Sequence, residues 1–165
     1  MACPTDPERT ADGRRLIIDG RRWRATDPDI PDALRVELVA ELMAARRTKQ
    51  RARVQDAKVA LGERGDSWWE PTEAGQRVRL AAAIRTLLRH REPDRTICPS
   101  DAARVVGGPG FRRLMPLARE VAAELADEGS LEVRQRGERV DLRTVRGPVR
   151  LARGPGWPTD DPAAR

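Results

Sequence analysis

The sequence has little cysteine, histidine or aromatic content, and each scarcity disfavours a class of chemistry. Its 165 residues include two cysteines, one histidine and no tyrosine. Two lone cysteines and one histidine match no usual zinc-ligand spacing, so we expect no metal site and no cofactor. His90 falls in the last turn of a predicted helix, where a capping role is the simpler expectation. Cys98 has no apparent general base nearby in the sequence, so we expect no catalytic nucleophile and no enzyme.

Long apolar stretches are also missing. No segment approaches the ~18 consecutive apolar residues that a membrane-spanning helix needs. Residues 1–14 contain no apolar run that could serve as a signal peptide. Cys3 lies in a polar N-terminus, where a structural disulfide is not expected. We therefore expect a soluble, cytoplasmic protein with no membrane partner.

Arginine, in contrast, is abundant. The net charge is +6, and only Lys49 and Lys58 among the 32 basic residues are lysines. Residues 131–153 alone hold seven arginines against three acidic residues. Positive charge concentrated in this way favours a polyanionic partner. The codon bias of a GC-rich genome is a second explanation, because it raises the pI without any selection for binding.

Residues 131–142 alternate apolar and polar side chains around Arg136-Gly137, a pattern that predicts a two-residue hairpin turn. This register forms an apolar face by pairing Leu131 with Leu142 and Val133 with Val140. On the other face Arg134 lies opposite Arg139. Because facing like charges destabilise a strand pair, a hairpin that keeps them together often has an anion to bind.

Three helices are predicted before this hairpin. Thr72 is the expected N-cap of a helix that runs to about His90, and Thr96-Ile97 can then form a single strand bridge. A short helix over residues 100–106 follows, and a third helix runs to about Asp127. The expected buried residues are Leu80, Ile84, Leu87 and Leu88 in the first helix, Ala102, Ala103 and Val106 in the second, and Leu114, Leu117, Ala118, Val121 and Leu125 in the third. The expected exposed residues of the third helix are Arg113, Pro116, Arg119 and Ala123.

The N-terminal half predicts a hairpin followed by two helices. The turn pair Asp19-Gly20 separates two short strands, with Leu16 opposite Trp23. Pro31 opens the first helix, and the second runs from about Thr48 to Leu61, where Gly62 ends it. The expected buried residues are Leu34, Leu38, Leu42 and Ala45 in the first helix, and Val54, Ala57 and Leu61 in the second.

Together these elements predict an α+β, mainly helical chain. An N-terminal β-hairpin plus helical hairpin is followed by a winged helix-turn-helix domain. The predicted divisions are a disordered N-terminus at 1–13, a ββαα unit at 14–66, a Trp-rich linker at 67–72, the winged-helix domain at 73–152 and a disordered tail at 153–165. Trp68 and Trp69, in the linker, are expected to pack one ring on each neighbouring unit. An exposed site for a partner or a nucleic-acid base is the alternative.

Four motifs of the C-terminal half occur in order. They are Ile97–Ser100, Arg112–Pro116, Leu125–Gly129, and a basic hairpin with Val140-Asp141 that leads to Gly147–Arg150. Through them residues 73–152 resemble a family of bacterial winged-helix proteins of unknown function, with Phe111 where the family usually has tryptophan. Residues 22–28 and 54–65 resemble a second group of small, uncharacterised bacterial proteins, some of which are labelled biopolymer transporter Tol. Because no segment here spans a membrane, that label is not carried over.

The favoured functional hypothesis is binding of duplex DNA. In a DNA-bound winged helix, the start of the recognition helix approaches the major groove while the wing contacts phosphates or the minor groove. The planar fork of arginine suits both tasks, because it binds guanine or phosphate at two points. The predicted contacts are Arg112, Arg113 and Arg119 from the helix, and Arg134, Arg136 and Arg139 from the wing.

A protein-interaction scaffold without nucleic-acid binding is the alternative. The later turns of the third helix are acidic, with Glu120, Glu124, Asp127 and Glu128, and many winged helices bind only proteins. In this hypothesis the contacts come from the N-terminal unit, through the helix that carries Leu34, Leu38 and Leu42, or from Trp68 and Trp69.

Overall fold

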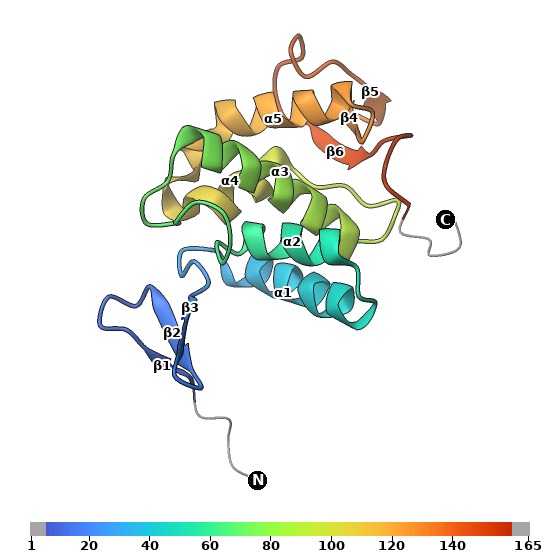
Figure 1. Cartoon of the computed structure of the whole chain (residues 1–165). Coiled ribbons are helices and arrows are strands. Elements are labelled where there is room, and N and C mark those ends of the chain that lie inside the picture. The colour runs from blue at the N-terminus through green and yellow to red at the C-terminus, as the bar shows by residue number, and fades with distance from the viewer. Residues whose placement is uncertain (1–5, 160–165) are drawn as a thin grey trace.

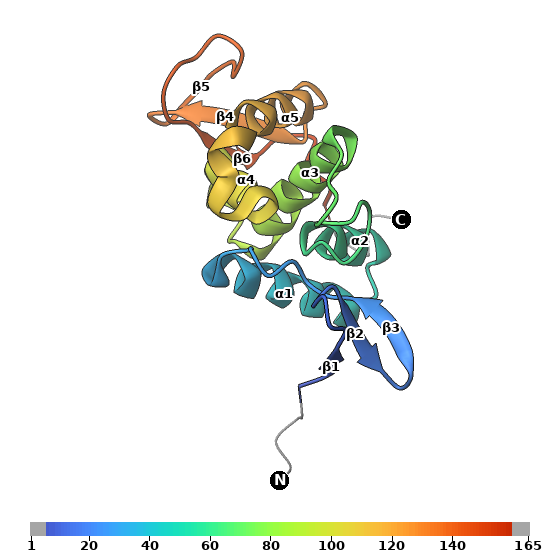
Figure 2. The ribbon, with the colours of Figure 1, turned by 90° about the vertical axis from the view of Figure 1, so that its left-hand side faces the viewer.

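The computed structural model describes residues 6–159 as an α+β, mainly helical chain with two small antiparallel sheets. Both views place one sheet at one end of a helical body and the second sheet at the opposite end (Figure 1, Figure 2). The disorder predicted for residues 1–5 and 160–165 lies outside the described residues.

The N-terminal sheet has the strand order β1-β2-β3. Its strands are β1 (Glu8–Arg9), β2 (Arg15–Ile18) and β3 (Arg21–Arg24). The predicted pairing of Leu16 with Trp23 is confirmed. The predicted disorder of residues 6–13 is wrong for β1, which pairs with β2 because Gly13, at φ 69°, lets the chain turn back.

A helical hairpin follows, formed by α1 (Asp32–Arg47) and α2 (Arg51–Ala60). The four apolar residues predicted for the inner face of α1 are all buried. Pro31 is the N-cap of α1 rather than its first residue. α2 begins later than predicted, because Lys49 adopts a left-handed conformation (φ 57°) and separates the two helices. Gly62, at φ 79°, ends α2 as predicted.

The central helix is α3 (Glu73–His90), and α4 (Pro99–Gly107) packs beside it. Thr72 caps α3 as predicted, since its hydroxyl accepts a hydrogen bond of 3.0 Å from the Gly75 N–H. The predicted core residues of α3 are completely buried. In α4 the buried valine is Val105 rather than Val106, because the inner face continues three residues after Ala102 rather than four.

The third predicted helix consists of a 3₁₀ segment, η1 (Gly108–Leu114), and α5 (Met115–Asp127). Its predicted inner face is buried at Ala118, Val121 and Leu125, and Leu114 and Leu117 are half-buried. Ala123 was expected on the exposed side, but it is only 5% exposed. The reason is that the chain after β5 folds back over α5, where buried Leu142 lines the same pockets as Ala123.

The second sheet has the order β5-β4-β6. Its strands are β4 (Leu131–Gln135), β5 (Glu138–Arg139) and β6 (Arg150–Arg153). The predicted turn at Arg136-Gly137 and the pairing of Arg134 with Arg139 are confirmed. The pairing of Leu131 with Leu142 is wrong, because the chain turns away at Asp141. Leu131 pairs instead with Arg153 of β6, and Ile97 forms the predicted single bridge, to Leu151.

Residues 153–159, which were predicted to belong to a disordered tail at 153–165, form hydrogen bonds with the rest of the chain. Arg153 belongs to β6 and donates a hydrogen bond of 2.7 Å to the Leu88 carbonyl at the end of α3. The Gly156 N–H bonds the Gly129 carbonyl at 2.8 Å, and Trp157 packs against the core. The disorder prediction is therefore wrong for residues 153–159, because these contacts close the tail onto α3 and the α5–β4 turn.

One hydrophobic cluster joins the two halves of the chain. α3 lies at its centre and contacts α1, α2, α4 and α5. Arginines of α3 and its C-cap also pair with carboxylates of the N-terminal half. These inter-half ion pairs are Arg79–Asp27 at 2.8 Å, Arg85–Asp56 at 2.8 Å, Arg89–Asp56 at 2.6 Å and Arg91–Glu37 at 2.9 Å. The predicted boundary at 67–72 stays a prediction, since buried side chains on both sides of it share this core.

Trp68 and Trp69 lie at this junction in a T-shaped arrangement, with ring centroids 5.1 Å apart. The Trp68 indole N–H donates to the Ala25 carbonyl at 3.1 Å, and its ring lines a cavity together with Val106 of the other half. The Trp69 ring lies beneath the guanidinium groups of Arg14, directly before β2, at 5.0 Å and of Arg24 in β3 at 5.7 Å. Trp68 thus touches both halves, whereas Trp69 does not take the predicted place on the second unit because the arginines of the hairpin cover it.

Candidate nucleic-acid interface

Residues 136–149, which connect β4 to β6 and include β5, form an arginine-rich segment that we call the basic loop. Two polar side chains fix its shape. Gln135 donates hydrogen bonds to the carbonyls of Arg146 (2.7 Å) and Pro148 (3.2 Å), which closes the base of the loop. Arg119 of α5 donates to the Val145 carbonyl at 3.0 Å. The basic loop is therefore anchored to both β4 and α5.

Two of the six predicted contact residues are engaged within the protein. Arg119 uses its guanidinium to hold the basic loop, as its bond to Val145 shows. Arg134 pairs with Glu132 at 2.7 Å, which offsets part of the repulsion expected between Arg134 and Arg139. Both arginines have structural partners, so neither is a free cation for an external phosphate.

Three of the four arginines of the basic loop are exposed without a partner in the described structure. Within residues 6–159, the side chains of Arg136, Arg139 and Arg146 form no hydrogen bond or ion pair. Arg136 and Arg139 were predicted as contacts, but Arg146 was not, because the alternating hairpin pattern ends at residue 142. Its neighbours in the sequence are engaged: Arg143 pairs with Asp127 at 2.6 Å, and Arg150 donates to Thr96 at 2.8 Å.

The remaining predicted contacts, Arg112 and Arg113, are exposed on η1 at the start of α5. The Arg112 guanidinium lies 5.5 Å from the Phe111 ring centroid, and Arg113 has no polar side-chain partner in the described part of the chain. Arg119, about one helical turn after the start of α5, contacts the basic loop, so the loop touches the helix that follows η1. In both views the basic loop, which includes β5, lies beside α5 (Figure 1, Figure 2).

The acidic residues of α5 are largely neutralised by neighbouring arginines. Arg77 of α3 pairs with Glu120 at 2.6 Å and with Glu124 at 3.0 Å. Arg143 binds Asp127, and its hydrogen bond together with its charge lowers the pKa of that carboxyl. The negative charge of these residues therefore opposes a polyanion less than the sequence alone implies.

The basic loop also limits which part of α5 is accessible. Leu142 is buried at 6% exposure, and the ion pair between Arg143 and Asp127 holds the loop across the last turns of the helix. Arg119 and Ala123, expected on the open side, lie under this cover. The arginines that remain exposed near the start of the helix are Arg112 and Arg113 of η1, while the exposed side chains of the later turns, Glu120, Glu124 and Asp127, are held by arginines.

No metal-binding cluster appears elsewhere in the described chain. Residues 6–159 contain no group of three or more histidine, cysteine or acidic side chains that could hold a metal ion. Cys98 is half-buried at the N-cap of α4, where its backbone N–H donates to Asp101 at 3.1 Å. None of the helices in this range is long and apolar enough to cross a membrane.

One segment of the C-terminal half matches a known protein family. Residues 77–154 match DUF3253, a protein family of unknown function. The match begins inside α3 and ends directly after β6, so it includes η1, α5 and the basic loop. The DUF3253 segment thus agrees with the expected resemblance to an uncharacterised family, and it supplies no activity. A comparison with proteins of curated function gives no match.

Proposed function

We propose that this chain binds duplex DNA as a winged helix, through the basic loop and η1. The observation that carries the proposal is the contrast between Arg136, Arg139 and Arg146, which have no partners in the described structure, and the engaged arginines around them. Unpaired guanidinium groups gathered on one loop keep their full capacity to bind phosphate. The element order supports the winged-helix assignment: α3, the Ile97 bridge, α4, α5, and a sheet in which β4 and β6 flank a loop.

The covered end of α5 determines how such a complex is arranged. Because the basic loop lies over the later turns, the helix approaches DNA with η1 and its first turn rather than along its length. Arg112 and Arg113 then lie where a base edge or phosphate can be reached, while the basic loop binds the backbone. Three to five phosphate contacts of this kind, depending on whether Arg112 and Arg113 contact phosphate or a base, give a slope of roughly −3 to −5 in log K against log salt, at about −0.9 per phosphate.

The test compares two variants that lose the same charge. The loop variant is Arg136→Gln, Arg139→Gln, Arg146→Gln, and the control is Arg47→Gln, Arg51→Gln, Arg95→Gln, which removes three exposed arginines outside the interface. Binding to a random-sequence duplex is measured by fluorescence anisotropy over a range of salt concentrations. We expect the loop variant to flatten the salt slope by about two to three units and the control to change it little. Unfolding curves check that both variants keep the parent stability.

Equal, weak binding by the parent and both variants at low salt would refute the proposal and leave codon bias as the source of the charge. Arg112→Ala and Arg113→Ala extend the test to sequence preference. If either arginine reads a base, its loss weakens binding to a selected site by about 1–3 kcal/mol while random duplex is affected less.

A second candidate function, docking of a protein partner, is favoured by one specific observation. Val36, Val39 and Met43 form a stripe on α1 and are 65%, 36% and 40% exposed. Exposed apolar side chains on one helix face are typical of interaction surfaces. Leu34, Leu38 and Leu42, which the scaffold hypothesis used, are instead buried in the core. If duplex binding fails, Val39→Asp and Met43→Asp test whether this stripe recruits a partner.

A further inference from the structure

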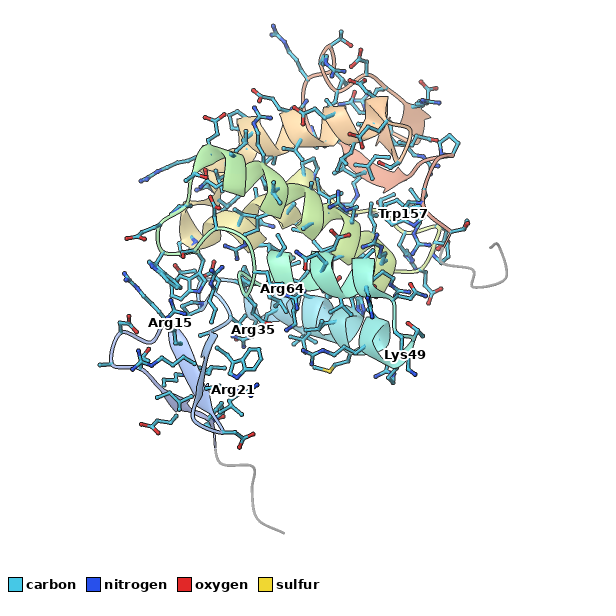
Figure 3. The ribbon with its side chains drawn as sticks, in the orientation of Figure 1. Arg15, Arg21, Arg35, Lys49, Arg64 and Trp157 are labelled. Carbon is cyan, nitrogen blue, oxygen red and sulfur yellow. The ribbon has the colours of Figure 1, made fainter. Side chains whose placement is uncertain are left out.

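A groove lies between the N-terminal sheet and the two helices α1 and α2. Its volume is about 820 Å³, within the range of ~300–1,000 Å³ typical of ligand sites. The hairpin contributes Ile18, Arg21 and Trp23, while Arg46 comes from α1 and Lys58 from α2. Figure 3 shows Arg21 on the hairpin and Arg64 close to the helices.

Trp23 is the unusual residue of this groove. It is 49% exposed, and in residues 6–159 its ring has neither a hydrogen bond nor a cation over its face. The other tryptophans are engaged: Trp68 bonds Ala25, and guanidinium groups lie over Trp69 and Trp157. An exposed indole with a free face is a platform on which a planar ring can stack.

Positive charges converge on the groove from separate elements. Its lining includes Arg21, Arg24, Arg46, Lys58 and Arg64 against two acidic residues, Asp19 and Glu63. Arg24 and Arg64 are held, by the Gly65 carbonyl at 2.7 Å and by Gln55 at 2.6 Å. Arg21 and Arg46 form no side-chain hydrogen bond or ion pair with any described residue.

Lys58 is half-buried in the lining of the groove, close to Arg46 and Arg64. Burial is the main cause that lowers the pKa of its ammonium group; Glu63 opposes the shift, and the charges of Arg64 and Arg46 add to it. A phosphate placed beside Lys58 would offset the charges of these three cations. The groove therefore offers an electrostatic site for an anion next to a stacking platform.

We propose that this groove binds an unpaired nucleotide, with its base stacked on Trp23 and its phosphate between Arg46 and Lys58. A lone indole beside a cluster of cations fits a base and its phosphate, the two groups that single-strand binders recognise together. An acidic peptide would satisfy the cations but leave the free face of Trp23 without a planar partner. The nucleotide can belong to a single strand or be free, and the two sources share this chemistry.

The site is independent of the proposed duplex interface. The groove adjoins the N-terminal sheet, whereas the basic loop lies at the opposite end of the molecule in both views (Figure 1, Figure 2). Failure of one site therefore leaves the other unaffected, and variants of each can be tested in the same full-length chain.

The experiment measures binding of fluorescein-labelled oligothymidylate to the full chain by anisotropy. We expect Trp23→Ala to weaken binding about 5- to 100-fold, the effect of losing one stacked base, and Trp23→Phe to retain most of the affinity because it keeps an aromatic face. Lys58→Gln should reduce the salt slope by about 0.7, the value for one phosphate of a single strand. Lys49→Gln, which removes the other lysine at the α1–α2 turn, is the matched control and should leave the slope unchanged.

Three further arms assign the ligand. Competition by thymidine 5′-monophosphate as strong as that by the unlabelled oligomer would identify a free nucleotide as sufficient, and weaker competition would identify the single strand; both support the groove. A glutamate-rich helical peptide that displaces the oligomer at lower concentration would overturn the proposal in favour of a protein partner. Unchanged oligomer affinity in Trp23→Ala would also overturn it. So would loss of oligomer binding in the Arg136, Arg139, Arg146 variant, because binding would then belong to the basic loop.

Discussion

The buried ion pair between Arg79 and Asp27 allows a quantitative test of how the two halves are joined. The two side chains are 9% and 6% exposed, and their nearest charged atoms are 2.8 Å apart. Arg79 also donates to the carbonyls of Ala60 at 3.1 Å and Val105 at 3.2 Å. One guanidinium therefore connects the segment before α1, the end of α2, and α4.

The expected loss of stability depends on the buried charge that each substitution leaves without a partner. Burial lowers the pKa of Arg79, while the charge and hydrogen bond of Asp27 oppose that shift. Asp27→Ala removes the opposing charge and leaves a buried guanidinium without a carboxylate, so we expect a loss of about 3–5 kcal/mol in the free energy of unfolding. Arg79→Met leaves the carboxylate uncompensated and should also destabilise the fold. The double variant removes both charges and should lose less than the sum of the two single losses.

Urea unfolding followed by far-UV circular dichroism gives the four free energies of this double-mutant cycle. Arg113→Met serves as the matched control, because Arg113 is exposed and has no polar side-chain partner in the described structure; its stability should stay within ~0.5 kcal/mol of the parent. If Asp27→Ala lost less than about 1 kcal/mol, or if the two single effects simply added, the buried pair would not be the coupled unit described here.

Two further predictions concern the core and the acid response. Leu125, at 6% exposure, docks α5 onto the core, so Leu125→Ala should lower the free energy of unfolding by about 2–5 kcal/mol; a melting temperature within a few degrees of the parent would contradict its place in the core. Burial by itself raises the pKa of Asp56, but hydrogen bonds and charge from Arg85 and Arg89 outweigh it and bring that pKa below its ordinary value of 3.8. A lowered folded-state pKa stabilises the protein above the unfolded value, and this contribution is lost as the pH falls through the folded-state pKa. The stability difference between the parent and Asp56→Asn should therefore be full at neutral pH and shrink below pH 3.8, whereas a difference that does not change with pH would refute this origin.

Local patterns predicted most helices and both hairpin turns. The periodic leucines of α1 and α3 and the turn pairs Asp19-Gly20 and Arg136-Gly137 depend on interactions between residues close in sequence, and the structure agrees with them. β6 was missed because Leu151 and Ala152 are both buried, so the strand does not alternate. β6 pairs with β4 on one side and forms a single bridge to Ile97 on the other, and a strand without alternation is detected poorly by sequence periodicity.

The positions of the candidate interface residues could be predicted only in part, for a related reason. Arg136 and Arg139 follow from the hairpin register, but the roles of Arg119 and Arg146 depend on how the chain returns over α5 after Asp141. Distant pairs such as Arg91 with Glu37 decide which arginines remain free, and residues far apart in the sequence leave no periodic signal. The groove at Trp23 likewise exists only when the hairpin, α1 and α2 are placed together.

The inter-half ion pairs have a consequence for any attempt to isolate the segment that matches DUF3253. That segment retains Arg79, Arg85, Arg89 and Arg91 but lacks Asp27, Glu37 and Asp56, which neutralise them. A fragment beginning at residue 77 would therefore present three newly uncompensated guanidinium groups along α3, while Arg91 at its C-cap would keep only its contact with Asp101 at 3.5 Å. Such a fragment would bind polyanions without selectivity. Its affinity for DNA would then come from arginines that truncation exposes and would not report the affinity of the full chain. Three carboxylates of the N-terminal half thus neutralise arginines of α3 and its C-cap, whereas Arg136, Arg139 and Arg146 of the basic loop have no such partner among the described residues.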